Sequence, residues 1–142
     1  MDTKYKSYVT RISSATSFGL TLVTYELAAE FIKTSEESLQ KNDRDEYEKF
    51  VEKSRGAVKI LIDALDYNVE ISLELFGLYS YIDSQLAAAY FTKDTEKARA
   101  ALTVARELLY RLYQSFKEID PENYEKTDLI LARYEGYGYS PQ

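Results

Sequence analysis

Apolar side chains recur at steps of three and four residues along most of the chain, which is the spacing of one face of an α-helix. The first such stretch begins at Thr16 or Ser17, either of which can cap a helix, and is expected to run to about Gln40. One face of this predicted helix carries Leu20, Val23, Leu27 and Phe31. A turn is expected at residues 41–43.

The next stretch separates apolar from charged positions most cleanly. Its apolar face consists of Tyr47, Phe50, Val51, Ser54, Ala57, Val58, Leu61, Ile62 and Leu65. The opposite face is charged, as expected for a helix that packs on one side only. Residues 66–68 are expected to end this helix, and Asn68 is a suitable cap for the next one.

A third helix is predicted from Val69 to Phe91, and it is apolar on nearly every side. Only Glu70, Glu74 and Asp83 carry charge in this segment. A helix of this kind either lies centrally in a bundle or lines a groove for a partner. The periodicity alone leaves both alternatives open.

Asp94 is expected to cap a fourth helix that ends near Ile119. The dipeptide Asp120-Pro121 then predicts a further helix start, because proline is favoured at the first helical position. A short fifth helix is therefore expected within residues 120–134.

The ends of the chain have weaker patterns. Residues 1–16 are expected to form an N-terminal arm, and residues 135–142 a tail. The loops between the long helices are short, so the helices are expected to pack antiparallel. The predicted fold class is thus all-α: one domain over residues 1–142 that consists of an antiparallel four-helix bundle over residues 17–119, an N-terminal arm, a short fifth C-terminal helix and a tail.

Composition narrows the possible chemistry. The 142 residues include no Cys and no His, so thiolate nucleophiles, imidazole bases and zinc sites built from these residues are excluded. Two carboxylate pairs, Glu26 with Glu30 and Asp63 with Asp66, each share a helix face, but no converging ligands are evident. We therefore predict no catalytic residue, no metal site and no cofactor.

The charge balance also bears on partners. With 18 basic and 24 acidic residues, the net charge is −6, which disfavours nucleic acid because binding to it depends on basic residues. Neither a signal peptide nor a run of 18 apolar residues is visible, so we expect no membrane insertion and a cytoplasmic location. The 14 tyrosines fit either a half-wet interface or the margins of a core.

Several segments together resemble a known family. Residues 15–25, ATSFGLTLVTY, resemble the pattern A-T-P-x-x-L-x-x-x-L-Y at the first helix of the flagellar secretion chaperone family (FliS). Residues 78–86, LYSYIDSQL, resemble its L-Y-D-Y-M-x-x-x-L on the third helix. The turn at 93–94 and the segment 68–71 also fall in the family's order, and the resemblance spans residues 5–117.

The resemblance implies a cytoplasmic export chaperone without enzymatic activity. Its implied partners are the C-terminal segment of flagellin, which it keeps from polymerising before secretion, and the flagellar export machinery. The implied client-binding groove would be formed by Ile71, Leu75, Tyr79, Ile82, Leu86, Tyr90, Ala101, Leu108 and Tyr113. The arm that the client would displace would present Tyr5, Tyr8, Val9 and Ile12.

Two other readings stay open. The broad apolar surface of the third helix also suits a structural dimer, or an adaptor that binds a different protein client. The sequence departs from the family at Ser17-Phe18, where a proline is usual, and at Ser84-Gln85, where a basic pair is usual. These departures bear on which client is bound.

Overall fold

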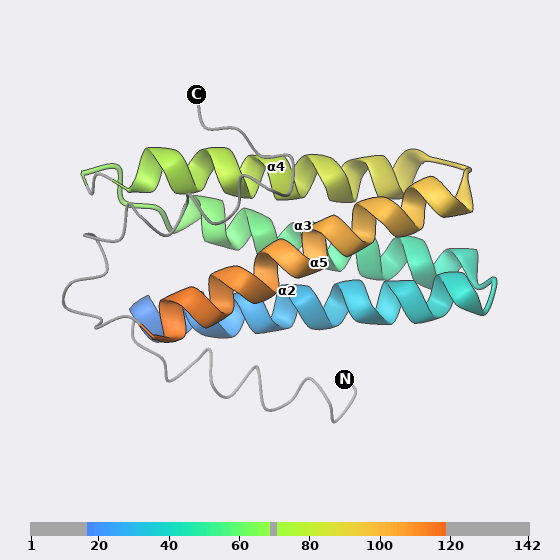
Figure 1. Cartoon of the computed structure of the whole chain (residues 1–142), viewed down its shortest axis with the longest axis horizontal. Helices are drawn as coiled ribbons and strands as arrows, with labels where there is room; N and C mark the ends of the chain where they lie inside the picture. Colours follow the sequence, from blue (N-terminus) through green and yellow to red (C-terminus); the bar gives the residue numbers. More distant parts are fainter. Residues whose placement is uncertain (1–16, 69–70, 119–142) are drawn as a thin grey trace.

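The described part of the chain forms four α-helices: α2 (Ser17–Gln40), α3 (Arg44–Asp63), α4 (Ser72–Phe91) and α5 (Thr95–Lys117) (Figure 1). This computed structural model describes residues 17–68 and 71–118, with side chains from residue 21 onward. These residues contain no strand, so the predicted all-α class is confirmed. The predicted arm, fifth helix and tail lie outside the described residues.

The helices form a closed arrangement of four. Each packs against the next in sequence, and α2 also packs against α5. Figure 1 shows the start of α2, the end of α3, the start of α4 and the end of α5 at one end of the bundle. Ring contacts agree with this view, because Tyr25 of α2 lies 6.2 Å from Tyr79 of α4 and 5.7 Å from Phe116 of α5.

Local signals explain where α3 and α5 begin. The Asp43 carboxylate accepts a hydrogen bond from the backbone N–H of Glu46 at the start of α3. The Asp94 carboxylate accepts from the N–H groups of Glu96 and Lys97, which confirms the predicted cap of α5. Both aspartates satisfy backbone donors that have no partner within the helix.

The turn before α3 needs a left-handed residue. Asn42 adopts a φ of 59°, a conformation that Asn tolerates better than most residues. This places the reversal of the chain at residues 41–43, where the polar cluster predicted it.

The predicted cap of α4 is wrong. The helix begins at Ser72, its cap position is held by Ile71, and no side chain bonds to the cap. Asn68 lies too early to act, because a cap side chain reaches only the N–H groups two or three residues ahead. Its own N–H instead donates to the Asp66 carboxylate, and Ser72 Oγ donates to the Asp66 carbonyl.

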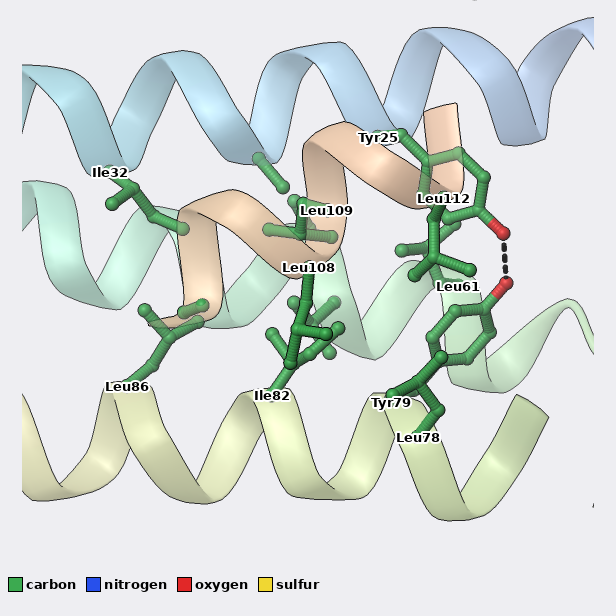
Figure 2. Packing of buried hydrophobic residues seen from close by; sticks show 14 of the residues in the cluster. Tyr25, Ile32, Leu61, Leu78, Tyr79, Ile82, Leu86, Leu108, Leu109 and Leu112 are labelled. Carbon is green, nitrogen blue, oxygen red and sulfur yellow. Dashed lines mark hydrogen bonds between the residues drawn. The ribbon is translucent and has the colours of Figure 1, made fainter. Parts of the chain in front are cut away.

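All four helices contribute to one apolar core. Figure 2 shows Leu78, Ile82 and Leu86 of α4 pointing toward Leu108, Leu109 and Leu112 of α5, with Ile32 of α2 and Leu61 of α3 beside them. The tyrosine hydroxyls in this core have partners. Tyr25 and Tyr79 hydrogen-bond each other through their hydroxyl groups, so two rings are buried without leaving a polar atom unsatisfied.

The opposite end of the bundle is held by α3. The Arg44 guanidinium donates to the carbonyls of Tyr90 and Thr92, at 2.9 and 3.2 Å. The Tyr47 hydroxyl donates to the carbonyl of Ala89. Because the last carbonyls of a helix lack partners within it, these bonds satisfy the end of α4 and fix α3 against it.

Replacement of Tyr47 by Phe is expected to cost about 0.5–1.5 kcal/mol of unfolding free energy near pH 8, the usual worth of a hydrogen bond. Burial raises the pKa of Tyr47 in the folded chain. The folded protein therefore keeps this proton where the unfolded chain loses it, so this contribution is complete below about pH 10 and declines above it. Urea unfolding should show a smaller difference in the free energy of unfolding between Tyr47→Phe and the parent at pH 11 than at pH 8. A constant difference would contradict this account.

Candidate docking surface

Within 17–68 and 71–118, no group of three or more acidic side chains is placed to hold a metal ion. No helix in these ranges is long and apolar enough to cross a membrane. Exposed apolar side chains and shallow hollows occur on the surface of these residues.

Most of the predicted groove residues belong to the core. Their exposed fractions are 8% or less for Ile71, Leu75, Tyr79, Ile82, Leu86, Ala101 and Leu108. Tyr90 and Tyr113 are only partly buried and pack against the edge of the core. All nine residues thus belong to or pack against one core, which extends along the bundle, and the stripe of α4 points inward. The arm residues Tyr5, Tyr8, Val9 and Ile12 lie outside the described part of the chain.

Large apolar side chains are nevertheless exposed on α4. Leu73 and Phe91 are each 71% exposed and Phe76 is 42% exposed. These residues lie outside the inward stripe, on the side of α4 that faces solvent. A helix in a small bundle ordinarily turns polar residues to water, so this outer face is a candidate contact surface.

Three of the exposed side chains gather at one end of the bundle. We define the end patch as Tyr67, Leu73 and Phe76. The rings of Tyr67 and Phe76 lie 6.4 Å apart, edge to face, at 63°. Leu73 and Phe76 are three residues apart and thus neighbours on α4. The end patch joins the segment after α3 to the first turns of α4.

The middle of the outer face of α4 is shallow. Its side chains are small, at Ser80, Ser84, Ala87 and Ala88, and none of these four is fully buried. Small residues permit a partner helix to approach closely. The outer face therefore has large apolar residues at its two ends and a strip of small side chains between them.

A hollow of about 320 Å³ lies between α3 and α4. Its lining residues are Glu52, Arg55, Gly56, Lys59, Ile62 and Asp83. Arg55 donates two hydrogen bonds to the Asp83 carboxylate, at 2.9 and 3.2 Å. The side-chain hydrogen bond to Asp83 raises the pKa of Arg55. Arg55 therefore remains charged at all working pH values.

Gly56 lies in this hollow and has open space around it. Apart from its chain neighbours and the backbone of its own helix, a methyl group added at its Cα would meet no atom within 4 Å. Gly56→Ala is therefore expected to raise the free energy of unfolding by about 0.5–1 kcal/mol, because alanine loses less backbone freedom in a helix. Urea denaturation would measure the gain; a loss of stability would show that the hollow is closed in solution.

A second hollow, of about 730 Å³, lies between α2 and α5. It is lined by Ala29, Glu30, Lys33, Arg106, Glu107, Tyr110, Arg111 and Gln114. Both signs of charge are present, and Arg106 pairs with Glu36 at 2.7 Å. Tyr110, which is 56% exposed, is the one aromatic ring in this lining. Most of the lining residues are charged, so this hollow is less suited to an apolar partner than the outer face of α4.

The sequence contained a signal for the outer face. Leu73 and Phe76 fall between the regular apolar positions of the third helix, which carries only three charged residues between positions 69 and 91. The regular stripe marks the buried side, so the apolar residues left over mark the side that remains exposed.

A family model matches most of the chain. The family is described as flagellar protein FliS, and the match covers residues 1–123. No curated protein matches the chain. Residues 124–142 lie beyond the match.

Proposed function

We propose, from the premise that this chain belongs to the FliS family of flagellar proteins, that it binds the C-terminal segment of flagellin. Membership in the family supports a role as a flagellar export chaperone. By holding this segment, the chaperone would keep flagellin from polymerising in the cytoplasm and would deliver it to the export machinery. No catalytic step is part of this proposal.

The observation that supports binding is the exposed apolar outer face of α4. A client segment that folds on binding buries on the order of 1,000–3,000 Å² of surface. Its ordering costs about 2–5 kcal/mol of the interaction free energy. Such a client needs a long, shallow apolar surface more than a deep pocket. Leu73 and Phe76 lie near one end of α4 and Phe91 lies at the other, so the outer face offers contacts along the whole helix.

The predicted groove residues take a smaller part in this proposal. Tyr90 and Tyr113 are accessible at the surface and can contact a client directly. The seven buried residues can do so only if the client separates helices of the bundle. We therefore propose first contact at the outer face of α4, with Tyr90 at its edge.

Titration calorimetry with a peptide of the flagellin C-terminal segment tests the proposal. We expect a one-to-one complex with a dissociation constant in the micromolar range or tighter, and a negative heat-capacity change from apolar burial. A scrambled peptide of equal composition is the control. The flagellin assignment fails if the authentic peptide gives no heat at tens of micromolar.

The exposed face of α4 also favours a second candidate, a dimer in which two copies cover each other's outer face. A stable interface usually buries about 800 Å² on each partner, which the length of α4 could supply. Sedimentation at increasing protein concentration separates the candidates. A monomer at high concentration removes the dimer and leaves the client-binding role.

A further inference from the structure

We propose that the segment beyond the family match, residues 124–142, docks on the end patch of its own chain. The end patch is an apolar surface with no described neighbour covering it, since Tyr67, Leu73 and Phe76 are 56%, 71% and 42% exposed. The family match ends at residue 123. The segment therefore adds chain length that the matched family pattern does not account for.

The position of the end of α5 supports this occupant. Phe116 contacts Tyr25 at 5.7 Å between ring centroids, and Tyr25 contacts Tyr79 at 6.2 Å. Phe76 precedes Tyr79 by three residues, or about one turn of α4. The described chain thus leaves α5 at the same end of the bundle that carries the end patch (Figure 1).

The segment is long enough to reach. Tyr124 lies six positions after Glu118, and an extended chain of that length spans up to about 20 Å. A helix with its side chains is about 10–12 Å across, so a chain leaving α5 can pass over the end of α4. The apolar triplet at residues 129–131 follows five residues later, with additional length to spare.

The composition of the segment fits the end patch. It contains the aliphatic triplet Leu129-Ile130-Leu131 and four tyrosines, at positions 124, 134, 137 and 139. Lys126, Asp128 and Arg133 lie around the triplet, so its margin is polar and carries both signs of charge. An apolar centre with a polar margin is the usual composition of a docking surface.

Docking there would regulate the proposed client site. The end patch is part of the outer face of α4, so the segment and the client would compete for Leu73 and Phe76. This consequence depends on the proposed function, whereas the docking itself does not. A segment tethered to its own surface has a high effective concentration, so only a client of sufficient affinity displaces it.

Disulfide trapping in the full chain tests the docking directly, because the protein has no native cysteine. One variant carries Leu73→Cys with Leu131→Cys. The control carries Tyr110→Cys with Leu131→Cys. Tyr110 is 56% exposed and lies on α5, closer in sequence to residue 131 than Leu73 is. An undocked segment would therefore reach Tyr110 at least as readily as Leu73.

We expect the Leu73 pair to form its intramolecular disulfide at least about tenfold faster than the Tyr110 pair. Adding Phe76→Ser to the Leu73 variant should remove that advantage. Equal rates, or a faster Tyr110 pair, would overturn the proposal. Cross-linking mainly between molecules would also overturn it, because a second copy would then be the occupant.

Adding the flagellin peptide separates this inference from the proposed function. Slower trapping of the Leu73 pair would support both the docking and the competition. Fast trapping that the peptide leaves unchanged, together with calorimetry that shows no binding, would overturn the flagellin assignment and leave the docking supported. Unchanged trapping by a peptide that does bind would overturn the competition.

Discussion

Replacing Leu86 by aspartate is expected to unfold the chain at ordinary temperature. Leu86 is fully buried between α4 and α5, and an unpaired carboxylate there costs several kcal/mol beyond the lost packing. Loss of packing alone costs about 2–5 kcal/mol. Together these costs approach the free energy of unfolding of a typical domain, which is about 5–15 kcal/mol. Circular dichroism should show loss of helix or a collapse of the melting temperature.

Two further variants keep this expectation testable. Leu86→Ala should fold, with its free energy of unfolding lowered by about 2–5 kcal/mol. Phe76→Asp places the same charge on the outer face of the same helix, and should change that free energy by less than about 1 kcal/mol. A melting temperature of Leu86→Asp equal to that of the parent would show that Leu86 faces solvent.

The double variant Leu73→Asp, Phe76→Asp is expected to weaken flagellin-peptide binding by at least about tenfold, because large apolar anchors dominate such interfaces. Its melting temperature should stay within a few degrees of the parent value, since both side chains are already exposed. Titration calorimetry measures the affinity, and thermal unfolding checks the fold.

Tyr110→Asp is the matched control for this loss. Tyr110 is a large exposed side chain on α5, so this variant introduces a charge of the same kind on a different face. Its affinity for the peptide should remain near that of the parent. If Tyr110→Asp weakens binding and the α4 variant does not, the client docks in the hollow between α2 and α5.

Much of the fold could be read from the sequence because its local signals agree with the packing. The stripe of α3 predicted its buried face, where Tyr47, Val51, Val58 and Leu61 are all core residues. The cap at Asp94 was equally clear, since its carboxylate and the following N–H groups are neighbours in sequence. The start of α4 was not predictable in this way, because the helix begins four residues after Asn68, at Ser72, and no side chain caps it.

The candidate site was harder to predict for a physical reason. Periodicity identifies which residues of α4 share a face, but α4 is apolar on most sides, so polarity does not show which face is buried. Leu86 and Leu73 have the same chemistry, yet one is fully buried and the other is 71% exposed. Leu86 belongs to the regular apolar stripe and Leu73 does not, and the positions of α3 and α5 around α4 establish that the stripe is the buried side.

The two ends of α4 differ in how firmly they are tied. Arg44 binds the carbonyls at its end, whereas no side chain caps its start. Amide protons exchange with solvent through local opening, which begins where such ties are fewest. The first turn of α4 should therefore exchange before its last turn. A client that docks at Leu73 and Phe76 would then contact the part of the helix that opens most readily. Its binding should slow amide exchange most strongly in this first turn of α4.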